Sequence, residues 1–166
     1  MYAASVPVCQ RYLGQLAGML DQAEAHAARQ ALDVPNLLQA RLTPDMLPLA
    51  LQVDIAAHFA LRACAPLAGL EVPDFGEHSG SFEQLQDRIR RNQAFLDTLT
   101  PELMEDGAQR SCSSRAGKAL VTLPGDAFLS QYALPNFFFP LSCTYAILRQ
   151  QGVPLGKADF DGWHVY

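Results

Sequence analysis

Hydrophobic residues recur at three- and four-residue steps along four stretches of the chain, which is the spacing of one face of an α-helix. These stretches are residues 6–30, 43–68, 81–99 and 124–152. Each carries polar residues on its other positions, so each predicts an amphipathic helix. Four such helices with short connections predict an all-α fold, a four-helix bundle.

Proline, glycine and capping residues mark the expected ends of these helices. A short helix is expected at residues 36–41, and Thr43 with Pro44 is expected to open the second long helix. Pro48 removes one more amide donor and delays the regular part of that helix. Residues 70–80 are rich in proline and glycine and predict a loop. Ser81 with Gln84 three positions later is the capping-box pattern, which sets the start of the third helix.

The stretch from residue 105 to residue 123 lacks the helical pattern. Ala116 and Gly117 could turn a small hairpin whose second arm alternates through Ala119, Val121 and Leu123. The first arm is polar and supports a strand only weakly. The sequence therefore predicts a small hairpin or irregular insertion between the third and fourth helices.

Composition narrows the class of protein. The chain has 166 residues, of which 49% are hydrophobic and 17% charged, and this mix excludes disorder and predicts a single domain over residues 1–166. The net charge is -5, so the chain lacks the excess of basic residues that is typical of nucleic-acid-binding proteins. The four cysteines form no CxxC pair, which fits reduced thiols in a cytoplasmic protein. No signal-peptide pattern and no apolar run of about 18 residues is present, so no membrane partner is expected.

Local motifs for catalysis or metal binding are missing from the sequence. It contains no GxSxG, GxxxxGK[ST], GxGxxG or HExxH pattern, so no catalytic residue is assigned and neither a cofactor nor a metal is expected. His58 falls about 180° from the core line of its helix, and the pattern predicts a solvent-facing strip with Asp54 and Arg62. His78 and His164 are placed in a loop and in the tail.

Asp45 and Gln52 are the most informative polar positions. They fall about 40° and 60° from the core line, on the same side, and Asp45 is expected in the first turn, partly buried and hydrogen-bonded near Gln52. Arg41 is the nearest candidate cation. One interpretation is structural, with Asp45 supporting the cap and Gln52 tying down a loop. The other is a polar corner that fixes a small-molecule ligand in an apolar cavity of the bundle.

Two further residues could join this candidate ligand site, and an aromatic run could form an interface. Asn92 lies on the core face of the third helix, and Tyr145 lies about 40° from the core line of the fourth. Residues 137–139 are three consecutive phenylalanines, which cannot all face one core. Either one packs against a partner chain, giving a homodimer, or a loop covers it; a core role is the alternative.

Three segments carry a resemblance to a known family: MYAASVPVCQRYLGQLAGMLDQAEAHA, ARLTPDMLPLALQVDIA and ALPNFFFPLSCTYAILRQQGVPLGKADF. They resemble the bacterial domain-of-unknown-function family DUF1993. The resemblance implies a bundle of the DinB/YfiT-like kind, whose better-known relatives are metal-dependent enzymes, some of them thiol transferases. Those relatives use three histidines facing the bundle interior. The family often has histidines where this chain has Gln131 and Pro140, which implies that this chain binds no metal there.

Two function hypotheses follow from different observations. The polar corner and the aromatic run favour a non-catalytic bundle that binds a small molecule or a partner. The resemblance alone favours the alternative, a DinB-like metal- or thiol-dependent transferase, and a shared fold does not by itself imply a shared activity.

Overall fold

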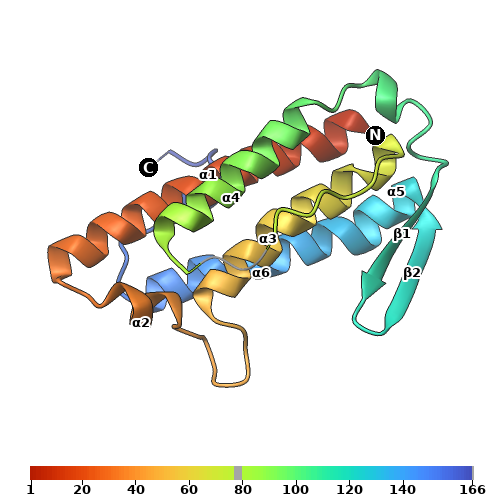
Figure 1. Ribbon diagram of the computed structural model, residues 1–166. Coiled ribbons are helices and arrows are strands. Elements are labelled where there is room, and N and C mark those ends of the chain that lie inside the picture. The colour runs from red at the N-terminus through yellow and green to blue at the C-terminus, as the bar shows by residue number, and fades with distance from the viewer. Residues whose placement is uncertain (77–79, 166) are drawn as a thin grey trace.

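The computed structural model describes residues 1–76 and 80–165. Four long helices lie side by side (Figure 1): α1 (Tyr2–Gln30), α3 (Leu49–Cys64), α4 (Phe82–Asp97) and α6 (Leu134–Gln150). The predicted all-α four-helix bundle is therefore confirmed. Shorter elements connect and flank these helices: α2 (Val34–Leu38), η1 (Pro66–Ala68), η2 (Glu102–Met104), β1 (Ser111–Ala116), β2 (Ala119–Pro124), α5 (Gly125–Ala127), η3 (Phe128–Ala133) and α7 (Lys157–Asp161).

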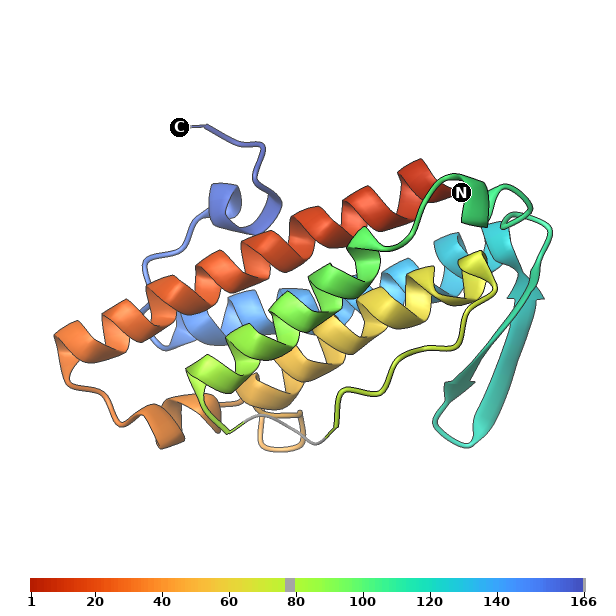
Figure 2. The same cartoon turned by 45° about the horizontal axis from the view of Figure 1, so that its top comes forward.

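The connections determine the direction of each helix. Helices α3 and α4 run in the same direction and α1 and α6 in the opposite one, so the chain after η1 must return along the length of the bundle (Figure 1). Side-chain bonds confirm that α1 and α4 are antiparallel. Gln86 bonds Asp21 at 2.7 Å, and Gln10 bonds Asp97 at 2.7 Å. Figure 2 shows the C-terminal segment with α7 beside α1.

Helix α3 is enclosed on most of its circumference. It packs against α4 and α6, and alanines at positions 56, 57 and 60 permit close approach of its neighbours. Its buried residues are Leu49, Ala50, Gln52, Val53, Asp54, Ala56, Ala57, Ala60, Leu61, Ala63 and Cys64. A helix enclosed in this way has little solvent-facing surface, so its polar side chains need partners inside the protein.

Several predicted boundaries are corrected by the structure. Helix α3 begins at Leu49 rather than at residue 43, because Pro48 occupies the cap position, and residues 43–46 form a turn. It ends at Cys64, before Pro66, rather than at residue 68. The first helix begins at Tyr2, four residues earlier than expected, and the short helix covers Val34–Leu38.

The predicted cap and hairpin are both present. Ser81 Oγ accepts a hydrogen bond from the Gln84 amide at 3.2 Å, which confirms the start of α4. Strands β1 and β2 pair antiparallel with Ala116 opposite Ala119. The turn is therefore formed by Gly117 and Lys118, one position later than expected, and the φ of 60° at Gly117 suits a glycine at the first turn position.

The fourth helix is not one regular α-helix. It begins as α5, continues as the π-helical segment η3 and becomes α-helical only from Leu134. Pro135 and Pro140 have no amide hydrogen, so the carbonyl groups of Gln131 and Asn136 lose their α-helical donors. The irregular part of the fourth helix lies against α3, next to the site described below.

No helix within residues 1–76 and 80–165 has the length and apolarity needed to cross a membrane.

Candidate functional site

A hollow of about 320 Å³ opens between α3, α6 and the turn that precedes α3. We call it the α3–α6 hollow. Its lining is Asp45, Met46, Leu47, Gln52, Ile55, Phe59, Asn136, Phe139 and Pro140. The volume is at the lower end of the range of ordinary ligand pockets, and most of the lining is apolar with a few polar groups, which is the usual composition of such pockets.

Helical spacing explains how the lining comes together. Gln52, Ile55 and Phe59 are three or four residues apart and share one face of α3. Asn136 and Pro140 are four apart on α6, and the turn at residues 45–47 closes one side. Asn136 was not predicted from the sequence, although it lies one helical turn before Pro140.

Two amides in the hollow are fixed by bonds to the backbone. Gln52 Nε2 donates to the Leu47 carbonyl at 3.2 Å, and Asn136 Nδ2 donates to the Tyr132 carbonyl at 2.7 Å. In the described part of the chain neither amide oxygen accepts a hydrogen bond. Gln52 therefore has the loop-fixing role that the structural interpretation gave it, and both side chains still offer an acceptor.

Asp45 differs from its prediction. It is exposed, it lies in the turn four residues before α3 instead of in the first turn of the helix, and it makes no bond to Gln52. Its partner is Thr43, whose hydroxyl donates to the carboxylate. That bond, with a smaller contribution from the Asp45 backbone amide, lowers the pKa of the Asp45 carboxyl group. The group is therefore ionised at neutral pH.

The other three predicted ligand residues do not line the α3–α6 hollow. Arg41 is exposed and donates to the Met46 carbonyl, so it braces the turn without pairing with Asp45. Tyr145 lines a separate hollow with Ser142, Lys157 and Phe160, beside α7. Asn92 is buried on the inner face of α4. Asp45 and Gln52 are thus the pair that the structure brings together.

Asn92 is a buried amide without a hydrogen-bond partner. Its side chain is 1% exposed, and neither its oxygen nor its nitrogen is bonded within the described residues. Replacing Asn92 with leucine, which is similar in size, should therefore raise the free energy of unfolding by about 1–2 kcal/mol, since an unpaired buried polar group is costly. Urea unfolding of Asn92→Leu measures this. A loss of stability would mean that the amide has a partner such as a buried water.

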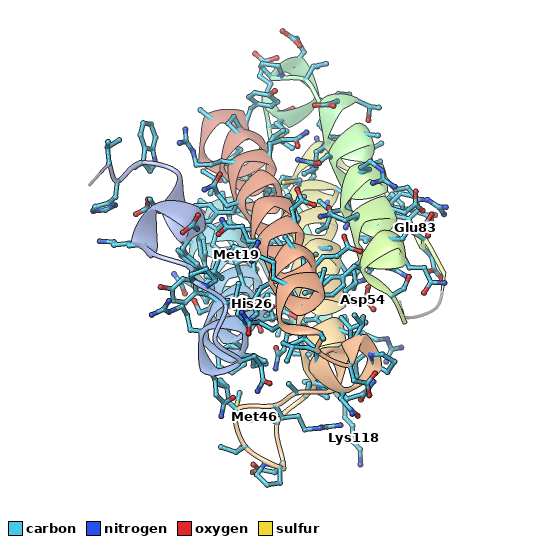
Figure 3. All side chains as sticks on the ribbon, turned by 90° about the vertical axis from the view of Figure 1, so that its left-hand side faces the viewer. Met19, His26, Met46, Asp54, Glu83 and Lys118 are labelled. Atoms are coloured by element: carbon cyan, nitrogen blue, oxygen red, sulfur yellow. The ribbon has the colours of Figure 1, made fainter. Side chains whose placement is uncertain are left out.

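A second hollow, of about 220 Å³, lies on the other side of Ile55 and Phe59. It includes Asp54, His58 and Arg62, the three residues predicted to form a solvent-facing strip. That prediction is wrong for Asp54, which is 3% exposed and pairs with Arg88 of α4 at 2.9 Å. Figure 3 shows Asp54 on the α4 side of the bundle and Met46 in the loop below α6.

His58 is half-buried among cations. Burial lowers the pKa of its imidazole, and the charges of Arg62 and Arg88 lower it further, while Asp74 acts in the opposite direction. Arg62 itself is held in place by the Tyr132 hydroxyl at 3.0 Å and by Ser114 Oγ at 2.6 Å. The bond to Ser114 joins the hairpin to the bundle. The second hollow is therefore lined by polar side chains that are bonded to one another or to neighbouring elements, and its histidine is neutral.

The histidine-based metal site of the wider superfamily does not fit these side chains. Gln131 is exposed on η3, contrary to the interior position that the resemblance implied, and Pro140 has no donor atom. His58 lies beside two guanidinium groups, which repel a metal cation. No group of three or more histidine, cysteine or acidic side chains within residues 1–76 and 80–165 could hold a metal ion. His78 lies outside the described residues.

The four thiols are poorly placed for nucleophilic chemistry. Cys9, Cys64, Cys112 and Cys143 are all buried. Hydrogen bonding to Cys64 and burial raise the pKa of Cys9, and burial raises the pKa of Cys112 and of Cys143. Because a raised pKa leaves less thiolate, fewer than about one thiol per chain should react with Ellman's reagent within minutes at pH 7.5. All four should react in urea; rapid labelling of the folded chain would contradict this assignment.

The aromatic run divides among three environments. Phe137 is buried, and Phe138 is half-buried, with its ring 4.8 Å from that of Tyr12. Phe139 is 63% exposed and forms part of the rim of the α3–α6 hollow. The homodimer suggested by this run stays a prediction, and Phe139 is the phenylalanine that such a partner would cover.

Comparisons with known proteins agree with this fold and with the resemblance. A solved structure, a DinB family member protein from Shewanella denitrificans, superposes with a TM-score of 0.88 at 29% identity, covering 99% of this chain and 93% of that one. No curated protein matches the chain. A model of the family described as Domain of unknown function (DUF1993) matches residues 1–161. The family model matches nearly the whole chain, and the fold is a DinB-like bundle. This chain therefore belongs to the DUF1993 family.

Proposed function

We propose that this chain is a small-molecule binding protein whose site is the α3–α6 hollow. The observation that carries the proposal is the combination of apolar walls with acceptor groups held in fixed positions. Gln52 and Asn136 are each oriented by a backbone bond, so their oxygens are placed before a ligand arrives. Preorganised polar groups in an apolar pocket are what give a ligand site its selectivity.

The alternative, a metal- or thiol-dependent transferase, has no comparable support in the described side chains. The thiols are buried, and the expected histidine positions hold Pro140, which has no ligating side-chain atom, and Gln131, whose amide is a poor substitute for imidazole. We therefore favour a binding function without a chemical reaction over a transferase function.

The proposal is tested by titrating ¹⁵N-labelled protein with 2-phenylethanol and following the backbone amide shifts. This probe has an apolar ring and one hydroxyl group, and it is small enough for a hollow of about 320 Å³. Saturable shifts are expected at Gln52, Ile55 and Asn136, with a dissociation constant in the millimolar range for so small a molecule.

Phe139→Ala and Leu120→Ala form a matched pair of variants for this titration. Both remove an exposed apolar side chain, 63% and 68% exposed respectively, and only Phe139 borders the hollow. Phe139→Ala should weaken binding several-fold, whereas Leu120→Ala should leave it unchanged. Shifts confined to another region, or shifts that depend on protein concentration because a second copy covers Phe139, would overturn the proposal.

A further inference from the structure

The polar side chains that border the α3–α6 hollow offer a ligand more acceptor sites than donor hydrogens. Gln52 and Asn136 each use one of their two amide hydrogens in a bond to a backbone carbonyl. Each side chain keeps one donor hydrogen and an oxygen that accepts on two lone pairs. Asp45 contributes a carboxylate, which only accepts hydrogen bonds when ionised.

The charge of the hollow has one sign. Asp45 is its only ionisable lining residue among those described, and it forms no ion pair in the described part of the chain. The nearby cations are bonded to other groups. Arg41 donates to the Met46 carbonyl, and Arg62, which lies over the Phe59 ring at 4.2 Å, donates to the hairpin. At the start of α3, the Leu49 and Gln52 amides donate to the Ala40 and Pro48 carbonyls, so these two donors are not offered to a ligand.

An aromatic ring completes the arrangement. Phe139 is mostly exposed at the rim, so the face of its ring is accessible to a ligand. A positively charged group is attracted both to an aromatic face and to a carboxylate. The two features occur together in one hollow whose floor, at Ile55 and Phe59, is apolar.

From this arrangement we propose that the α3–α6 hollow selects amphipathic amines, molecules with an apolar body and a protonated amine head. The inference rests on the proposed binding function and adds the chemical class of ligand. The apolar body lies against Ile55 and Phe59. The ammonium group lies between the Asp45 carboxylate and the Phe139 ring and donates to the Gln52 or Asn136 oxygen.

Three probes of similar size separate this inference from the binding function itself: phenethylamine, 2-phenylethanol and phenylacetate. At pH 7 and low salt, phenethylamine should bind at least about threefold more tightly than 2-phenylethanol, and phenylacetate should bind most weakly. The preference should persist at pH 5, because the Thr43 hydrogen bond holds the pKa of Asp45 below its usual value. It should shrink as salt is added.

Asp45→Asn is the decisive variant, and Glu24→Gln on the exposed surface of α1 is its charge-matched control. Asp45→Asn should weaken phenethylamine binding more than 2-phenylethanol binding and bring the two affinities to within about twofold of each other. Glu24→Gln should change neither. Equal affinities for the three probes, or tightest binding of phenylacetate, would overturn the amine selectivity while leaving the binding function standing. Failure of all three to bind would overturn both.

Discussion

Asp54→Asn should lower the free energy of unfolding by about 3–5 kcal/mol. The carboxylate is 3% exposed and lies 2.9 Å from the Arg88 guanidinium, whose side chain is only 12% exposed. The nearly isosteric amide keeps the shape of the side chain and removes its charge, so the largely buried Arg88 cation loses the counter-charge that Asp54 supplies. Equilibrium urea unfolding, monitored by circular dichroism, measures the loss.

The same helix offers a control. Arg91 pairs with Asp87 at 2.6 Å, and both side chains are about half exposed. Arg91→Ala should therefore change the free energy of unfolding by less than about 0.5 kcal/mol, as exposed pairs usually do. If Asp54→Asn costs no more than Arg91→Ala, the pairing of α3 with α4 does not depend on this ion pair and the account of the α3 core is wrong.

Gly125→Ala should lower the free energy of unfolding by about 3 kcal/mol or prevent folding. A Cβ atom at this position would lie 1.8 Å from the Gly107 carbonyl oxygen and 3.0 Å from the carbonyl carbon, and backbone atoms cannot move aside as a flexible side chain can. The two segments are also joined by the Asp126 amide, which donates to the Ala108 carbonyl at 3.2 Å. Thermal unfolding of the variant tests this close approach.

Gly18→Ala is the matched substitution. Gly18 lies inside α1, and a Cβ there would meet nothing within 4 Å. Alanine is the better helix former, so this variant should gain about 0.5–1 kcal/mol. Equal effects of the two substitutions would show that Gly125 is not enclosed by the Gly107 backbone.

The helices were predictable because their burial follows a simple period. The hydrophobic faces of the four long helices, the Ser81 cap and the hairpin all reflect local patterns of side-chain type. The start of α3 was placed too early because two prolines, at positions 44 and 48, each could open a helix, and the structure uses the second.

The burial of Asp54 could not be predicted from a single helical wheel. A wheel assumes one buried face, yet α3 is covered by α4 as well as by α6. That arrangement depends on the long return connection after η1, which makes α3 and α4 run in the same direction (Figure 1). The partner of Asp54 is Arg88, 34 positions away, and no local pattern links the two residues.

The candidate site was predictable only in part for the same reason. The shared side of Asp45 and Gln52 indicated that they lie near each other, and both border one hollow. An angle on a wheel does not say which neighbour covers a position. Tyr145 was therefore grouped with them, although it lines another hollow with Lys157 and Phe160 of α7. The contributions of Asn136 and Phe139 depend on the prolines that shape the fourth helix.

The most direct test of the account is a map of where an amine probe contacts the protein. Intermolecular nuclear Overhauser effects should be measured between phenethylamine and a methyl-labelled sample. We expect cross-peaks from the probe's ring protons to the methyl groups of Met46, Leu47 and Ile55, all of which border the α3–α6 hollow. Cross-peaks to methyl groups elsewhere, with none from these three residues at saturating probe, would contradict it.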